Sequence, residues 1–167
     1  MELFFDGFCT KDGSGARVVL ISPEKENIIQ SCKLDFEVTN SVAEYEAFLL
    51  GLQLAKILKV QNLSVFTDSE LIVKQVRNIF QTKHPKLRSY RDEVWDLVKN
   101  SDNFELNSIP RSQNNDVDLL ANVASRLLPV EIFSREWFSI EIIFRPSVPN
   151  HIKNLRVFDY MIKSKIF

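Results

Sequence analysis

The sequence predicts an α/β fold in which helices flank a mixed, five-stranded β-sheet. Three short apolar segments joined by turn residues occupy the first 36 positions, and this pattern predicts an antiparallel meander. Helical and strand periodicities then alternate along the chain. Because a strand–helix–strand crossover brings its two strands together in parallel, we expect the first, fourth and fifth strands to be parallel.

The three strands of the meander are separated by clear turn signals. We expect the strands at residues 2–9, 16–22 and 28–36. Between them, "TKDGSG" at 10–15 and "PEKEN" at 23–27 are rich in residues that favour turns. The third strand is predicted by the rough alternation of its apolar and polar residues.

A helical period begins at "TNSVAEYEAFLLGLQLAKILK". Thr39, Asn40 and Ser41 are all residue types that cap helices, and Ser41 with Glu44 three residues later fits a capping box. One face of the helix is apolar. It consists of Ala43, Ala47, Leu50, Leu54 and Leu58.

The rest of the domain repeats strands and helices. We expect a strand at 62–69, helices at 70–80 and 87–99, a strand at 103–110 and a final helix at 114–128. Asn114 or Asn115 would cap this last helix, and Pro129 would stop it. We therefore assign residues 1–128 to one domain and residues 129–167, which show no clear period, to a peripheral or poorly ordered tail.

Composition excludes several classes of protein. The chain has 167 residues, 45% hydrophobic and 26% charged, which is typical of a globular domain. Its net charge of −1 gives no overall positive field for nucleic acid, so any such binding needs a local patch. Cys9 and Cys32 are too few for a disulfide framework or a cysteine zinc site. Without a membrane-length apolar run or a signal-peptide pattern, we expect an intracellular protein.

Four carboxylates stand at element boundaries. Asp6 and Asp68 close the first and fourth strands, and ligands gather at the carboxyl ends of strands in open sheets. Glu44 and Asp118 lie in the first turns of two helices. Taken singly, each has an ordinary role as a turn, cap or solvated helix residue. Taken as an ordered set, they predict a site for divalent cations such as Mg²⁺, because clustered negative charges need a positive partner.

In that order, the motifs resemble ribonuclease H type 1, and in particular the ribonuclease H-like domains of plant long-terminal-repeat retroelement polyproteins. The matching segments are "LFFDG", "GSGARVVLISPE", "TNSVAEYEAFLLGL", "VFTDSELIVKQV" and "IPRSQNNDVDLLANVAS". The resemblance covers about residues 2–128 and implies a ribonuclease H-like fold. It also implies cleavage of the RNA strand of RNA–DNA hybrids by two Mg²⁺ ions, for which Mn²⁺ would substitute.

The resemblance also implies roles for particular residues. Its metal ligands would be Asp6, Glu44, Asp68 and Asp118, and Thr39 and Asn40 match positions that touch the substrate backbone and minor groove. Lys83, Lys86, Arg88 and Arg91 either contact phosphates or form a solvated face.

Two departures from the family pattern stand out. The segment before the last carboxylate carries Arg111 where many members have a histidine. Arg17 replaces a residue that is usually small, and either lies close to Asp6 or points to solvent.

The sequence is compatible with three functions. The complete set of four carboxylates favours an active hybrid ribonuclease. The missing histidine and modest basic patch favour a weak or inactive nucleic-acid-binding remnant of a retroelement. The aromatic tail would suit a protein-interaction module. In each case we expect a monomer that derives from a polyprotein with reverse transcriptase and integrase.

Overall fold

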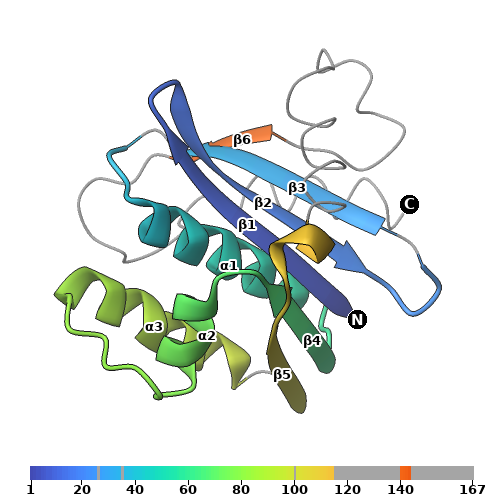
Figure 1. Ribbon diagram of the computed structural model, residues 1–167. Coiled ribbons are helices and arrows are strands. Elements are labelled where there is room, and N and C mark those ends of the chain that lie inside the picture. Colours follow the sequence, from blue (N-terminus) through green and yellow to red (C-terminus); the bar gives the residue numbers. More distant parts are fainter. Residues whose placement is uncertain (26, 35, 100, 115–139, 144–167) are drawn as a thin grey trace.

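The computed structural model describes residues 1–25, 27–34, 36–99, 101–114 and 140–143. Within them, six strands form one sheet in the order β5-β4-β1-β2-β3-β6 (Figure 1). The strands are β1 (Glu2–Thr10), β2 (Gly13–Ile21), β3 (Asn27–Leu34), β4 (Asn62–Thr67), β5 (Asn103–Ser108) and β6 (Ile140–Ile143). The helices are α1 (Asn40–Ile57), α2 (Glu70–Val76) and α3 (Pro85–Val98).

The antiparallel meander is confirmed, with a tighter first turn than expected. β1 and β2 pair from Glu2↔Ile21 to Thr10↔Gly13, so only two residues connect them. Gly13 has a φ of 145°, a conformation that side chains rarely allow, and this lets the strand begin directly after the turn. β2 therefore starts three residues before the predicted strand at 16–22.

The parallel half of the sheet is also confirmed. β1 pairs with β4 in parallel, and β4 pairs with β5 in parallel over six residues from Asn62↔Asn103 to Thr67↔Ser108. The sixth strand, β6, was not predicted, because the segment that contains it has no clear period. It lies parallel to β3 at the edge of the sheet.

The helix boundaries differ from the prediction in two places. α2 ends at Val76 instead of Phe80, because Asn78 adopts a left-handed conformation (φ 58°) that breaks the helix. The amide groups of Ile79 and Phe80 both donate to the Lys74 carbonyl and close this end. α3 begins at Pro85, since proline suits the first helical positions.

The capping box predicted at Ser41 and Glu44 is wrong. Thr39 is the N-cap of α1, and its side-chain oxygen accepts the Val42 amide hydrogen at 3.3 Å. Because the helix begins earlier than the box requires, Glu44 lies just beyond the first turn and its carboxylate has another partner. Thr39 thus satisfies one of the amides that the start of a helix leaves without a partner.

The final helix lies mostly outside the described residues. Residues 111–114 are helical, so helical structure begins before the cap that was predicted at Asn114 or Asn115. Asn114 uses its side chain as a donor to a carboxylate. Within the described part of the chain, none of the helices has the length and apolarity needed to cross a membrane.

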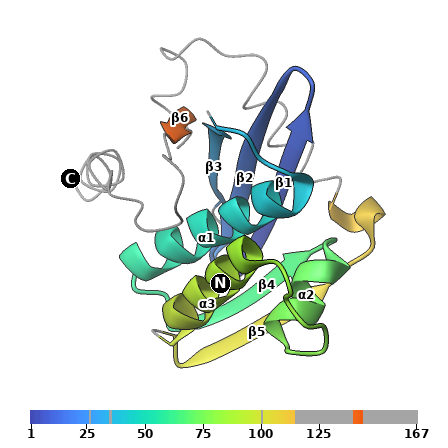
Figure 2. The same cartoon turned by 90° about the vertical axis from the view of Figure 1, so that its left-hand side faces the viewer.

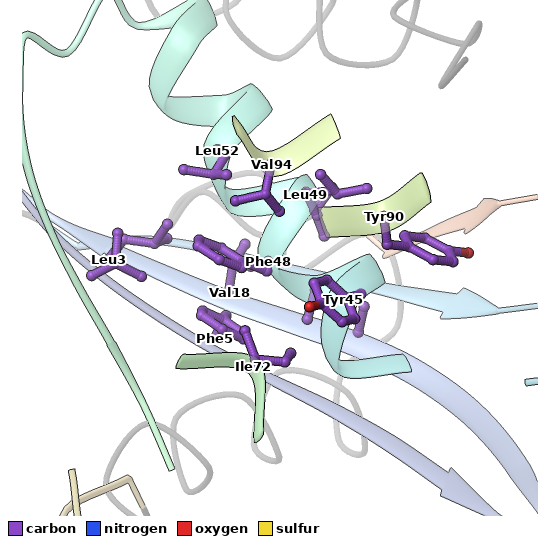
Figure 3. Packing of buried hydrophobic residues seen from close by; sticks show 14 of the residues in the cluster. Leu3, Phe5, Val18, Tyr45, Phe48, Leu49, Leu52, Ile72, Tyr90 and Val94 are labelled. Atoms are coloured by element: carbon purple, nitrogen blue, oxygen red, sulfur yellow. The ribbon is translucent and has the colours of Figure 1, made fainter. Parts of the chain in front are cut away.

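The main core lies between α1 and the sheet, and α3 packs on the other side of α1 (Figure 2). Phe5 of β1 stacks on Phe48 of α1, with their ring centroids 4.6 Å apart (Figure 3). The apolar face predicted for α1 is buried up to Leu54. The helix is also buried on its other side, where Tyr45 stacks on Tyr90 of α3. This packing fixes where the start of α1 meets the sheet.

Candidate active site

Asp6 lies on the face of β1 that points away from α1. Side chains alternate along a strand, and Leu3, Phe5 and Gly7 are the buried set that packs towards α1. Asp6 belongs to the opposite set, and its side chain is 20% exposed. The carboxylate is therefore accessible to solvent although it lies on an inner strand of the sheet.

Gly7 lets the start of α1 lie directly on β1. A Cβ atom at position 7 would come within 2.1 Å of the Ala43 carbonyl carbon and 2.2 Å of the Glu44 amide nitrogen. No side chain fits in that space, so the peptide between Ala43 and Glu44 packs against the glycine backbone. This close approach places Glu44 beside the strand segment that carries Asp6.

The strand register brings Asp68 towards the same point. β1 and β4 pair up to Phe4↔Phe66, and these two rings stack with their centroids 4.9 Å apart. Asp6 and Asp68 each lie two residues further on, and Asp68 follows the last residue of β4. Asp68 therefore lies just past the carboxyl end of β4, whereas Asp6 lies in the middle of β1, because that strand continues to Thr10 and does not close at Asp6 as predicted.

Glu44 is tied to the end of β4 through Ser69. The Ser69 hydroxyl donates a hydrogen bond to Glu44 Oε2. Burial raises the pKa of the Glu44 carboxyl above its usual 4.5; the Ser69 hydrogen bond opposes this, the Asp68 charge adds to it, and Arg111 opposes it. Glu44 thus feels the charge of Asp68, as expected for two carboxylates that share a site.

Asp68 is held from the segment that follows β5. Asn114 Nδ2 donates to Asp68 Oδ1 at 3.0 Å, and Asn114 is only 3% exposed. Arg111 Nε lies 3.9 Å from Asp68 Oδ2, but its side chain is 86% exposed. Asn114 is therefore the fixed partner, and Arg111 adds a solvent-screened positive charge. In Figure 2, the short helical segment at 111–114 lies at the same end of the sheet as the starts of α1 and α2.

Asp6 has a cationic partner from the neighbouring strand. Arg17 is its register partner on β2, and Arg17 Nη2 lies 3.0 Å from Asp6 Oδ2. Of the two alternatives for Arg17, proximity to Asp6 is therefore correct. The guanidinium carbon also lies 4.5 Å from the centroid of the Phe8 ring.

Of the four predicted ligands, Glu44 and Asp68 lie close enough to interact electrostatically, and Asp6 directly precedes Gly7, which packs against the backbone of Ala43 and Glu44. The fourth, Asp118, lies outside the described residues. Across the described ranges, no group of three or more histidine, cysteine or acidic side chains has metal-binding geometry. The sequence reasoning did not identify Ser69 or Asn114 as carboxylate partners. Ser69 had a usable signal, since it directly follows Asp68.

The predicted substrate-binding residues fall into two separate groups. Thr39 and Asn40 are exposed at the start of α1, a few residues before Glu44. Lys83, Lys86 and Arg88 lie on the α2–α3 connection and the beginning of α3. Only the first group adjoins the carboxylates along the chain.

A cavity of about 220 Å³ lies beside the second group, and Lys83 and Arg88 are among the residues that line it. It is lined by Asn78, Phe80, Gln81, Thr82, Lys83, Arg88 and Arg91. Arg91 is already engaged, because it pairs with Asp92 at 2.8 Å and lies over the Trp95 ring. Lys83 is exposed at the cavity, and the buried Thr82 hydroxyl there has no hydrogen-bond partner. This combination of cations and an unsatisfied hydroxyl suits an anionic group.

The donor chemistry at the sheet edge suits a hard divalent cation. Asp6, Glu44 and Asp68 offer only oxygen donors, which Mg²⁺ and Mn²⁺ prefer. Burial is the main cause of the raised pKa of Glu44 and the Asp68 charge adds to it; a nearby cation would stabilise the ionised carboxylate against both. At Asp6, by contrast, Arg17 already supplies positive charge, which reduces the need for a cation there.

The chain is similar to known sequences over most of its length. The reverse transcriptase-like family matches residues 4–124. Ribonuclease HI of Halobacterium salinarum is 29% identical over 126 residues, which cover 74% of this chain and 63% of that protein. A bifunctional protein of Mycobacterium tuberculosis is 31% identical over 112 residues, 67% of this chain and 30% of that protein. The match thus spans less than two thirds of the length of either relative.

Solved structures show the same fold. Ribonuclease H1 of Halobacterium salinarum superposes with a TM-score of 0.67 at 26% identity, over 73% of this chain and 94% of that one. LC11-RNase H1, solved in complex with an RNA/DNA hybrid, gives a TM-score of 0.64 at 26% identity, over 72% and 93% of the two chains. With its mixed sheet and this sequence match, the chain belongs to the reverse transcriptase-like family and contains a ribonuclease H-like domain.

Proposed function

We propose that this chain hydrolyses the RNA strand of RNA–DNA hybrids with the help of two divalent metal ions. The observation that supports the proposal is the placement of the described acids: Glu44 interacts with Asp68, and the start of α1 packs on Gly7, the residue after Asp6. A structure with the same fold has been solved with an RNA/DNA hybrid, which supports this choice of substrate. The metals would be Mg²⁺, with Mn²⁺ as a substitute.

Asp6, Glu44 and Asp68 would hold the metal ions together with Asp118. The ions would supply positive charge that activates the attacking water and stabilises the leaving oxygen. The chain's own contribution is to hold the ligands. Asn114 fixes one oxygen of Asp68, and Ser69 fixes one oxygen of Glu44. Buried or half-buried partners of this kind reduce the rearrangement that ion binding requires.

The substrate would be held by its backbone. Thr39 and Asn40 are exposed at the start of α1, where the positive end of the helix dipole favours phosphate. Lys83 and Arg88, which line the cavity on the α2–α3 connection, and Lys86 at the start of α3 would contact a more distant phosphate. Because such contacts recognise the shape and phosphates of a hybrid, we expect cleavage that is independent of sequence.

Cleavage of a labelled RNA–DNA hybrid with Mg²⁺ or Mn²⁺ tests the proposal. We expect Asp68→Asn to lower the rate by about 100-fold or more, because it removes charge from the metal site. Asp96→Asn is the matched control, since the Asp96 side chain is 74% exposed on α3 and its ion pair with Lys99, at 2.7 Å, is screened by solvent. Equal activity in Asp68→Asn and the wild type would contradict the proposal.

A second candidate is a weak or inactive hybrid-binding protein. The contact between Arg17 and Asp6 favours it, because a guanidinium already occupies one oxygen of a proposed metal ligand. This candidate predicts hybrid binding without cleavage at any tested concentration of Mg²⁺ or Mn²⁺. The same assay, combined with a binding measurement, therefore separates the two functions.

A further inference from the structure

Arg17 lies where its charge acts directly on the candidate metal site. Its side chain is 9% exposed, and its Nη2 atom lies 3.0 Å from Asp6 Oδ2. Arg17 and Asp6 are direct register partners in the antiparallel pair, so the contact does not depend on a flexible loop. The two side chains stand on the same face of the sheet.

Packing keeps the guanidinium in this position. Its central carbon lies 4.5 Å from the centroid of the Phe8 ring, on the same strand as Asp6. A cation over an aromatic face is attracted to it, and more strongly where water is excluded. Arg17 is therefore held by a carboxylate and a ring together, which makes it costly to move.

The guanidinium already contacts one of the two carboxylate oxygens that Asp6 could offer to a divalent ion. An ion that binds Asp6 through Oδ2 must displace Arg17, and an ion that uses other donors remains close to its positive charge. Both routes lower the affinity for the ion, because like charges repel strongly where solvent screening is weak. A small or neutral residue at position 17 would impose neither cost.

We propose that Arg17 is a positioning residue that acts as a resident counter-ion of Asp6 and sets the concentration of divalent cation at which the site fills. The inference rests on the proposed function, because it concerns the same carboxylates. It predicts a site that stays mostly empty at low divalent concentration and fills only when the ion competes successfully with the guanidinium.

Calorimetric titration of the full chain with Mn²⁺ alone, without nucleic acid, tests this inference. We expect Arg17→Gln to lower the apparent Kd for Mn²⁺ by about tenfold or more. Arg17→Lys keeps the charge and should remain close to the wild type. If the glutamine variant does not fold, as judged by thermal unfolding in EDTA, Arg17→Thr repeats the test with a residue suited to a strand.

Arg91→Gln is the matched control. Arg91 also pairs with an aspartate, Asp92 at 2.8 Å, and also lies over an aromatic ring, 4.4 Å from the centroid of Trp95. It lies on α3, outside the group of carboxylates, so its replacement should leave the Kd for Mn²⁺ unchanged. A similar gain of affinity in Arg91→Gln would show a general charge effect and overturn the inference.

The remaining outcomes separate this inference from the proposed function. Unchanged or weaker Mn²⁺ binding in Arg17→Gln overturns the inference, and hybrid cleavage by the wild type would still support the proposed function. Tighter binding in Arg17→Gln, with no cleavage by the wild type, supports the inference alone. If neither protein binds Mn²⁺, the inference and the proposed metal site are both wrong.

Discussion

At the scale of single residues, each described carboxylate of the site has a partner of different chemistry. Asp6 contacts a guanidinium, Glu44 accepts from a hydroxyl, and Asp68 accepts from an amide. The charge of Asp6 is thus balanced within the protein. Glu44 keeps a carboxyl whose ionised form is disfavoured by burial. Before any ion binds, the negative charge of Asp6 is therefore balanced by Arg17, whereas a negative charge on Glu44 is disfavoured by burial.

The raised pKa of Glu44 predicts a pH-dependent stability change. In the folded protein the Glu44 pKa lies above its unfolded value of 4.5, so the folded state holds the proton more tightly. The free energy of unfolding contributed by this group therefore falls as pH rises from about 4.5 through the folded pKa. Glu44→Gln has no carboxyl group to ionise, so this loss of stability with rising pH disappears. The glutamine carbonyl can still accept a hydrogen bond from the Ser69 hydroxyl.

We therefore expect Glu44→Gln to be more stable than the wild type at pH 7.5 in EDTA, with the difference shrinking towards pH 4. Urea unfolding at the two pH values measures both quantities. Glu24→Gln, at an exposed position in the turn after β2, serves as the control. If Glu44→Gln were less stable than the wild type at pH 7.5, the contacts of ionised Glu44 would outweigh the cost of its burial.

The sequence identified the carboxylates but not their partners. Asp6, Glu44 and Asp68 were recognisable by their order among the motifs, although the structure places Asp6 in the middle of β1 and Glu44 beyond the first turn of α1. The Arg17 contact remained undecided between two alternatives, since it depends on β1–β2 register, and that register follows from a two-residue turn that was predicted as six residues. Asn114 was predicted only as a possible cap, because its role as a donor to Asp68 depends on where β5 leads the chain.

At the scale of elements, the site depends on how closely α1 approaches β1. Gly7 is the contact point, and the peptide between Ala43 and Glu44 fills the space where a side chain would be. The order of strands and helices followed from periodicity, but this contact could not, because periodicity says nothing about the distance between elements. The end of α2 was missed for a related reason, since the left-handed Asn78 interrupts an apolar pattern that continues to Phe80.

Gly7→Ala tests the α1–β1 contact. The added methyl group would collide with backbone atoms, which cannot rotate away, so we expect a loss of about 3 kcal/mol or more in the free energy of unfolding. Gly51→Ala is the matched control on the same pair of elements. Its Cβ would meet Leu3 Cδ1 at 2.7 Å, a side-chain atom that can shift, and alanine also favours the helix.

Chemical denaturation of both variants measures the difference. Gly7→Ala should be clearly the less stable of the two, and its Glu44 side chain should move relative to Asp68. If Gly51→Ala were equally destabilised, side-chain overpacking alone would explain both losses, and the special role of the Gly7 backbone contact would be wrong.

At the scale of the whole molecule, the charge distribution decides how nucleic acid is held. The net charge of −1 provides no general attraction, so affinity must come from local groups. One such group consists of Lys83 and Arg88, which line the cavity on the α2–α3 connection, and Lys86 in the first turn of α3. Sequence composition could locate these cations but could not separate phosphate contacts from a solvated face, because both readings place the side chains at the surface.

Salt dependence separates those two readings. If Lys83 and Lys86 each contact a phosphate, Lys83→Gln with Lys86→Gln should reduce the slope of log K against log salt by about 2, since each contact contributes roughly 0.9. Lys56→Gln with Lys59→Gln makes the same change in net charge at the far end of α1, where both lysines are exposed.

Binding is best measured in an Asp68→Asn background, so that cleavage does not consume the hybrid. A phosphate-contact role requires the first pair to lower the slope and the second to leave it unchanged. Equal slopes in both double variants would mean that the cations beside the cavity are a solvated face, and that the hybrid is held mainly at the start of α1.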